Sequence, residues 1–135
     1  MCAEHAAHER VSYEAQGKLE RLNAALFGSP ARLHGWVAVD EAEPIGYATA
    51  TVEFATWSAE PFMHMDCLFV RARHRNRKVG LELISAVVRE AERRRIRDLQ
   101  WQTPQWNADA DRFYRRIGAR VSEKYRYTLS LAEAK

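Results

Sequence analysis

The chain has 135 residues, of which 47% are hydrophobic and 29% charged, a composition typical of one soluble globular domain with a packed core. No apolar run is long enough to span a bilayer, and the opening MCAEHAAHER lacks the apolar stretch of a secretory signal, so we expect a cytoplasmic protein without a membrane partner. Cys2 and Cys67 are too few for a disulfide framework, and no Cys or His spacing predicts a metal site.

We expect a single domain over residues 1–135, with residues 1–11 as a flexible tail. The first half of the chain then predicts a helix followed by three strands, over residues 13–27, 36–40, 45–55 and 62–70. Leu19, Leu22 and Leu26 lie at helical spacing, and Gly28 with Pro30 ends that helix. The strand segments are rich in Thr, Val, Tyr and Phe, and the first two form a hairpin across an acidic turn.

The second half predicts helices alternating with strands, over residues 79–95, 98–103, 109–117 and 121–131. In the first helix, Leu81, Ile84 and Val87 belong to one apolar stripe. Gly118 follows the second helix directly, as a helix stop does. The last segment alternates Tyr and Leu with polar residues, which is the period of a strand. Strands alternating with helices after an opening hairpin predict an α/β fold with a mixed sheet.

The net charge is +3, and the basic residues gather in two blocks. The first block holds Arg71, Arg73, His74, Arg75, Arg77 and Lys78, and the second holds Arg89, Arg93, Arg94, Arg95 and Arg97. Such blocks suit an anionic partner, but for the second block a solvated helix face is an equally good interpretation. Nucleic-acid binding through the arginines is a further alternative, and no recognition motif supports it.

The first block lies between a predicted strand and the start of a predicted helix. The first N–H groups of a helix have no intrahelical partner, and the helix dipole makes that end positive, so a turn placed there binds phosphate. Gly80 lets the backbone approach a ligand closely, and Asn76 tolerates a left-handed conformation. Arg75, Arg77 and Lys78 add positive charge to a diphosphate site. The spacing fits neither a P-loop nor a dinucleotide fingerprint.

A second motif, downstream, joins this loop in a family resemblance. The pattern N-x-x-A-x-x-F-Y-x-x-x-G-A is filled by Asn107, Ala110, Phe113, Tyr114, Gly118 and Ala119. Arg75, Lys78 and Gly80 stand at the positions of the pyrophosphate loop R/Q-x-x-G-x-G/A. Over residues 19–128 the chain therefore resembles the GCN5-related N-acetyltransferases (GNAT). Within that family it most resembles the diamine, or spermidine/spermine-type, acetyltransferases.

This resemblance implies a mostly antiparallel mixed sheet flanked by helices, a homodimer, and acetyl transfer from acetyl-coenzyme A to a small, polyamine-like primary amine by direct attack without a metal. It implies roles for three groups of residues. Tyr114 would act as general acid toward the coenzyme A sulfur, and Asp66 would accept the amine proton. The cofactor would be bound by Leu68, Phe69, Val70, Arg75, Asn76, Arg77, Lys78, Val79, Gly80, Asn107 and Arg116.

The chain departs from the family pattern at three places. Lys78 replaces the usual loop glycine, and Asp66-Cys67 replaces the Glu-Asp of the diamine subgroup. The usual opening strand and first helix are expected to be absent or much shortened, which would leave a sheet edge open for a dimer partner to cover.

Alternative interpretations remain open for several residues. Tyr114 beside Phe113 also fits a core aromatic, and Asp66 in an apolar strand fits a structural carboxylate as well as a catalytic one. Cys67 is interpreted as a small buried hydrophobe and not as a nucleophile. For the whole chain, the alternative to an enzyme is a non-catalytic acyl-CoA-binding or regulatory module.

Overall fold

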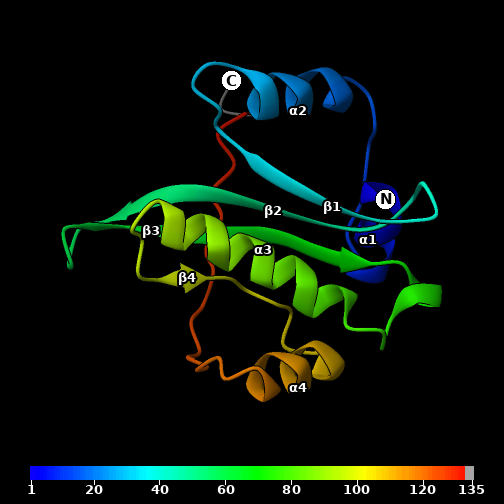
Figure 1. The fold of residues 1–135 in the computed structure, drawn as a ribbon. Coiled ribbons are helices and arrows are strands. Elements are labelled where there is room, and N and C mark those ends of the chain that lie inside the picture. The colour runs from blue at the N-terminus through cyan, green and yellow to red at the C-terminus, as the bar shows by residue number, and fades with distance from the viewer. Residues whose placement is uncertain (133–135) are drawn as a thin grey trace. The chain divides into compact units, whose positions relative to one another are not determined.

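The structure, a computed structural model, describes residues 1–132 and divides into two compact units, Met1–Gln102 and Thr103–Lys135. The first unit contains α1 (Cys2–His8), α2 (Lys18–Phe27), β1 (His34–Asp40), β2 (Glu43–Ala55), β3 (Glu60–Val70), the short 3-10 helix η1 (Ala72–His74), α3 (Val79–Arg93) and β4 (Leu99–Gln100). The second unit contains α4 (Ala108–Arg116) (Figure 1). The predicted α/β class is confirmed.

The four strands form one sheet in the order β1-β2-β3-β4. The first three strands are antiparallel neighbours, whereas β4 runs parallel to β3. This is the mostly antiparallel mixed sheet that we predicted. The register places Tyr47 of β2 between Val37 of β1 and Phe69 of β3, and it pairs Met63 of β3 with Leu99 of β4.

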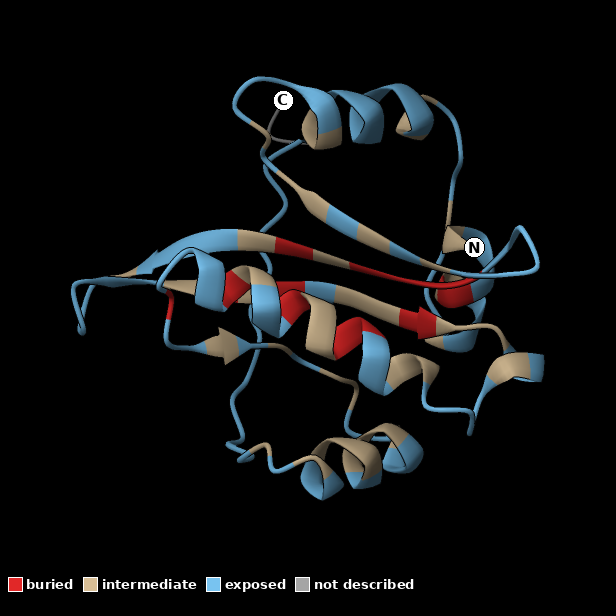
Figure 2. Ribbon diagram, in the orientation of Figure 1, coloured by how far each residue is buried: buried red, intermediate tan, exposed pale blue. Residues whose placement is uncertain are grey.

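The core lies between α3 and one face of the sheet. Met63 of β3 and Val87 of α3 are fully buried, and Figure 2 shows buried stretches recurring along α3, which lies in front of the strands. Gly46 of β2 permits the close approach of the helix, since a Cβ atom added there would lie 3.3 Å from Leu83 Cδ1 and 2.9 Å from the Phe69 carbonyl oxygen. Burying a side chain the size of Val contributes about 1.5–3 kcal/mol, so this layer holds α3 in place.

The other face of the sheet carries α1, which corrects the expectation of a flexible tail over residues 1–11. His5 of α1 is buried, its Nδ1 lies 2.7 Å from the Tyr47 hydroxyl, and its ring stacks on Phe69. Arg71 pairs with Glu4 at 3.1 Å and so attaches α1 to the end of β3. Residues 2–8 have no apolar periodicity, and the partners that order them lie far along the chain. The opening helix is therefore present, with seven residues.

Three other boundaries differ from the predictions. Helix α2 begins at Lys18 and not at residue 13, because Gly17 immediately before it has a left-handed φ of 72°. Strand β4 has two residues where six were expected over 98–103. Residues 121–131 form no strand, since no neighbouring strand within the described chain pairs with them. Their large apolar side chains are exposed, with 87% of Tyr125 and 90% of Tyr127 accessible.

Two further features are absent from residues 1–132. No helix in that range combines the length and the apolar character that crossing a bilayer requires. In the same range no three His, Cys, Asp or Glu side chains gather closely enough to hold a metal ion.

Candidate functional site

The basic loop between β3 and α3 has the backbone geometry of an anion site. Asn76 and Lys78 both adopt left-handed conformations, with φ of 62° and 65°, and Lys78 is the N-cap of α3. The Lys78 carbonyl accepts the first hydrogen bond of the helix, from the N–H of Glu82 at 3.0 Å. The N–H groups of Val79, Gly80 and Leu81 therefore precede the first intrahelical bond, at the positive end of the helix dipole. Successive backbone N–H groups in such a turn form the kind of concave site that binds anions in proteins.

The side chains of this loop do not all point at the same target. Arg77 and Lys78 are exposed. Arg75 instead folds back along β3, where its Nε donates to the Val70 carbonyl at 2.9 Å and its guanidinium lies 5.5 Å from the centre of the Phe69 ring. In this conformation Arg75 covers the end of β3, and Arg77 and Lys78 supply the free positive charge beside the loop.

Strands β3 and β4 separate after a short paired stretch (Figure 1). They pair only at Met63 with Leu99 and at His64 with Gln100, while β3 continues to Val70. On that side of β3, the stretch after His64 has no neighbouring strand within the described residues. The edge thus offers main-chain N–H and C=O groups to an extended ligand.

A β-bulge at Asp66 decides which groups face this open edge. The N–H of Met63 donates to the Asp98 carbonyl, on the β4 side, whereas the N–H of Arg71 donates to the Ile45 carbonyl of β2. In a regular strand, the N–H groups of residues an even number apart point to the same side, so those of Met63 and Arg71 would agree. They point to opposite sides because the register shifts opposite Thr49 and Ala50, where Asp66 is the extra residue. After it, Leu68 and Val70 address the open edge, whereas Phe69, the third residue that the resemblance assigned to the pantetheine arm, addresses β2.

Asp66 lies at this bulge beside a histidine. Its side chain is 62% exposed, and its Oδ1 lies 3.9 Å from His64 Nε2. Its Oδ2 lies 3.8 Å from the Cys67 sulfur, which is the donor. The sequence reasoning selected Asp66 but missed His64. The available signal was the spacing His-x-Asp within an otherwise apolar strand, which brings two polar side chains close together.

The environment of Cys67 agrees with its interpretation as an unreactive residue. Burial raises the pKa of the Cys67 thiol, and the negative charge of Asp66 raises it further. The pKa of the neighbouring Tyr47 hydroxyl is also raised, mainly by burial. Both groups therefore stay protonated near neutral pH, and a thiolate nucleophile is disfavoured at this position.

The remaining predicted site residues lie in the second unit, on α4. Asn107 is its N-cap and accepts a hydrogen bond from the N–H of Ala110 at 3.2 Å. The rings of Phe113 and Tyr114 are 5.5 Å apart, and the Arg116 guanidinium lies 5.9 Å from the Phe113 ring centre. Gly118 has a φ of 97°, as expected of the residue that ends the helix. Asn107 thus has a structural role at the start of α4, whatever else it contacts.

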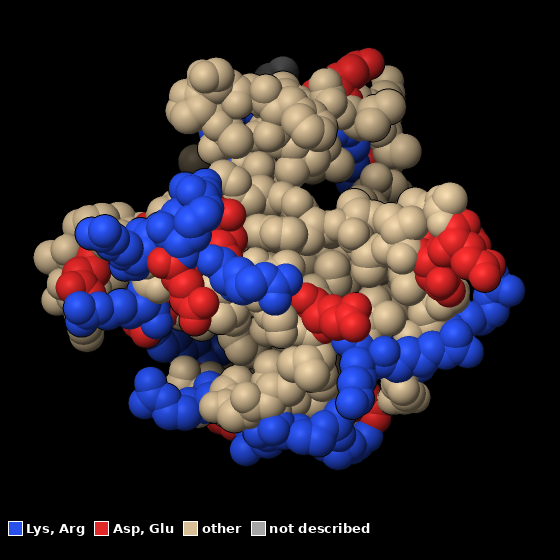
Figure 3. Space-filling view, viewed as in Figure 1, with Lys and Arg blue, Asp and Glu red and all other residues tan. Residues whose placement is uncertain are grey.

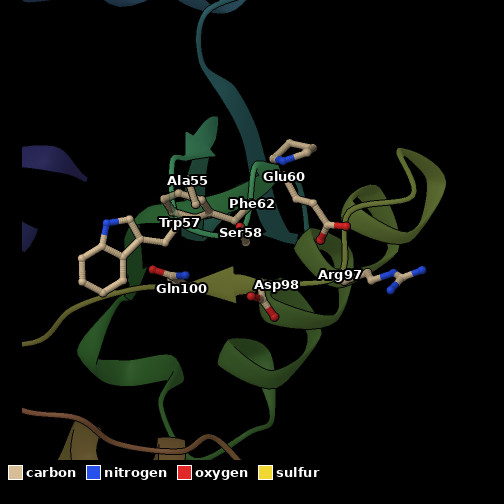
Figure 4. A pocket seen from close by; sticks show the side chains of 9 residues that line it. Ala55, Trp57, Ser58, Glu60, Phe62, Arg97, Asp98 and Gln100 are labelled. Atoms are coloured by element: carbon tan, nitrogen blue, oxygen red, sulfur yellow. The ribbon is translucent and has the colours of Figure 1, made fainter.

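A separate shallow hollow of about 240 Å³ lies at the start of β3, away from the basic loop at the end of that strand. Its lining includes Trp57, Glu60, Asp98 and Gln100, and the Trp57 ring is fully exposed (Figure 4). None of the residues predicted for cofactor binding lines this hollow.

The second basic block is partly neutralised. Glu90 of α3 pairs with both Arg93 and Arg94, and the hydrogen bond from Arg93 is the main cause that lowers the pKa of Glu90. Figure 3 shows basic and acidic side chains intermixed on the visible face of the molecule. For this block the solvated helix face is the better-supported interpretation.

Comparison with known proteins places this geometry in a family. A sequence model of the Acetyltransferase (GNAT) family matches residues 3–119, which include both motifs and every candidate site residue. The chain belongs to the GNAT family. The resemblance inferred from the loop and the Asn107 motif is thereby confirmed at the level of the family. No comparison tests the narrower resemblance to diamine acetyltransferases.

A curated acetyltransferase resembles the chain at low sequence identity. L-ornithine N5-acetyltransferase NATA1 from Arabidopsis thaliana is 25% identical over 81 residues, which are 60% of this chain and 36% of that protein. The chain thus spans about a third of the length of this curated relative.

Two solved structures resemble the chain over most of its length. An aminoglycoside acetyltransferase, meta-AAC0020, from an uncultured soil metagenomic sample superposes with a TM-score of 0.79 at 20% identity, covering 96% of this chain and 86% of that one. Aminoglycoside N-acetyltransferase AAC(6')-Iy in complex with CoA gives a TM-score of 0.71 at 21% identity, covering 94% and 91%. At these identities the likeness is one of fold.

Proposed function

We propose that the protein transfers an acetyl group from acetyl-CoA to a primary amine of a small molecule. The observation that carries this proposal is the continuous run from β3 through the basic loop into α3. It joins an open strand edge at Leu68 and Val70 to unpaired N–H groups at Val79 and Gly80. The GNAT family match covers the whole run.

The shape of acetyl-CoA fits these two features. The N–H groups from Asn76 to Gly80 bind the diphosphate, with Arg77 and Lys78 adding charge. The amide-containing pantetheine arm extends along β3 from Val70 toward Leu68, where main-chain groups point outward. Arg75 leaves the Val70 carbonyl when the arm binds there. The family fold thus supports a site for acetyl-CoA in which backbone groups do most of the binding.

Transfer needs an acid and a base. The amine nitrogen attacks the thioester carbon, the carbon–sulfur bond breaks, and the departing thiolate takes the proton of the Tyr114 phenol, which stays protonated near neutral pH. By the family resemblance, the amine gives up its proton beside the Asp66 carboxylate, at the bulge of β3. Asn107 and Arg116 contact the cofactor. These roles are carried over from the family motifs.

The acceptor that we propose is a small molecule with more than one amino group. One relative bears the name of an ornithine acetyltransferase and two structural neighbours those of aminoglycoside acetyltransferases, which supports this class of amine. A polyamine belongs to the same class, and the Asp66-Cys67 pair leaves one carboxylate where the diamine subgroup has two.

We further propose that the protein is a homodimer of the cytoplasm. Tyr125, Tyr127, Leu129 and Leu131 alternate along one side of residues 121–131 and are each at least 74% exposed. Each aromatic hides roughly 150–250 Å² when buried, so symmetric burial of this segment supplies much of the roughly 800 Å² per partner of a stable interface. The free thiols of Cys2 and Cys67 suit a reducing compartment.

The decisive experiment mixes the protein with acetyl-CoA and a panel of ornithine, aminoglycosides, polyamines and amino acids, and follows free thiol. We expect thiol release with at least one multi-amine acceptor. Tight coenzyme A binding with no thiol release from any amine would instead identify the non-catalytic acyl-CoA-binding alternative.

Two variants test the assigned residues in the same assay. Gly80→Val places a branched side chain against the diphosphate and should abolish acetyl-CoA binding, measured by calorimetry. Tyr114→Phe should lower kcat by roughly a hundred-fold or more with little change in cofactor affinity, whereas Tyr13→Phe serves as the matched control with normal turnover. Normal binding by the Gly80 variant would contradict the loop assignment.

A further inference from the structure

The strands β3 and β4 part at one titratable side chain that the family motifs did not single out. His64 pairs in register with Gln100, and this is the last pair before the two strands separate. Asp66 follows two residues later at the bulge, and Leu68 is the first residue after it to face the open edge. His64 therefore lies at the fork of the sheet, on the approach to the place where the proposed thioester carbonyl would bind.

His64 is accessible and lies on the side of the sheet that α3 does not cover. Its neighbours in the strand, Met63 and Met65, are buried toward α3, with 0% and 3% accessible. Because successive side chains of a strand point to opposite faces, His64 lies on the face away from α3, where Thr51 is its partner in β2. Its side chain is 26% exposed, so the imidazole is held by its surroundings and still open to a ligand.

Asp66 supplies a negative charge next to this imidazole. Oδ1 of Asp66 lies 3.9 Å from Nε2 of His64, which is a charge contact and too long for a hydrogen bond. A carboxylate at that distance attracts a positive charge on the ring. Nε2 is the ring nitrogen beside Asp66, so Nδ1 is the nitrogen left for the proton of a substrate.

We propose that His64 is the general base of acetyl transfer, with Asp66 as its positioning residue. This inference rests on the proposed function above. As the amine nitrogen forms its bond to the acetyl carbon, its proton passes to Nδ1 of His64. The carbon–sulfur bond breaks, the thiolate receives the Tyr114 proton, and the imidazolium later returns its proton to water.

Basicity favours the histidine over the carboxylate in this role. A free imidazole is a stronger base than a free carboxylate by roughly two pKa units, so it competes better for the proton of an amine. The Asp66 side chain, 62% exposed, lies largely in water beside the ring. Asp66 thus supports the base and does not replace it.

The experiment measures kcat, KM and acetyl-CoA affinity for the full chain, His64→Ala, His64→Gln, Asp66→Asn and the control His34→Ala, using an acceptor from the panel. We expect both His64 variants to lose roughly a hundred- to ten-thousand-fold in kcat with acetyl-CoA affinity within about two-fold of the parent. Asp66→Asn should lower kcat by about ten-fold. Added imidazole should restore part of the rate of His64→Ala only, because the removed side chain leaves room for it.

Each result has one interpretation. A kcat of His64→Ala close to that of the parent, or a loss that imidazole does not rescue, would overturn the role of His64. Loss in Asp66→Asn with normal turnover in His64→Ala would return the base role to Asp66. A parent protein that releases no thiol with any amine would refute the proposed function itself, and the inference with it.

Discussion

Two residues of the basic loop show how much local conformation depends on side-chain type. Asn76 takes the left-handed conformation that its side chain tolerates, as predicted. Lys78 takes the same conformation at the position where the GNAT loop has glycine, which explains the family preference for glycine there. Lysine in place of glycine adds a positive charge to the loop and introduces backbone strain at this position.

This strain gives a prediction for Lys78. Lys78→Gly should leave the free energy of unfolding within about 1 kcal/mol of the parent, because relief of the left-handed strain offsets the added flexibility of the unfolded chain. Lys78→Val should lower it by about 1–2 kcal/mol, because a β-branched residue is poorly tolerated at positive φ. Urea denaturation measures both, and equal stabilities for the two variants would contradict the assigned conformation.

His34 gives a prediction for pH. Burial lowers its pKa, and the Arg94 guanidinium, 3.4 Å away, lowers it further. The unfolded chain therefore binds a proton at this residue more readily than the folded chain, so His34 contributes a loss of stability as the pH falls below about 6.5. We expect His34→Gln to reduce the fall in Tm between pH 7.5 and 5.5, measured by calorimetry. An unchanged slope would show that His34 is not one of the groups responsible; His8, whose pKa is also lowered, accounts for a remaining part.

At the scale of elements, the helix α3 and the first three strands were predicted to within a few residues, because their apolar periodicity is local. Other features depend on partners far along the chain. The burial of α1 requires Tyr47, forty-two positions from His5, and the bulge at Asp66 is defined only by the register against β2. The roles proposed for His64 and for the open edge depend on these long-range pairings, so the sequence pattern did not predict them.

Two adjacent valines test the packing of α3. Val87 is fully buried against the sheet, whereas Val88 is 37% exposed. Val87→Ala should lower the free energy of unfolding by about 2 kcal/mol, through lost burial and the cavity it leaves. Val88→Ala, the same change one position later, should cost about 0.5 kcal/mol or less. Equal losses in urea denaturation would mean that the inward face of α3 is misassigned.

At the scale of the whole molecule, residues 121–131 connect the chain to its proposed partner. The alternating pattern predicted a strand, and the structure leaves that segment without a neighbouring strand among the described residues and with its apolar side exposed. Both observations are reconciled if a second copy pairs with this segment. A strand with one apolar and one polar side gains most when both copies contribute the same surface.

Sedimentation analysis tests this pairing with a matched pair of variants. Leu129→Lys, on the exposed apolar side, should convert a dimer into a monomer, because a charge would be buried at the interface. Ser130→Lys, on the polar side of the same segment, should remain dimeric. A parent protein that sediments as a monomer at tens of micromolar concentration, or equal dissociation of both variants, would contradict the proposed interface, and circular dichroism verifies that each variant is folded.

The extra residue at Asp66 divides one strand between two tasks. Before it, main-chain groups of β3 are committed to neighbouring strands, and after it the alternate groups are turned outward. Beyond the bulge β3 has two sides: Cys67 and Phe69 address β2, while Leu68 and Val70 address the open edge. Under the proposed function the cofactor is held by main-chain groups, which a side-chain substitution does not remove, so a chain of this design keeps its cofactor while the side chains that meet the acceptor diverge.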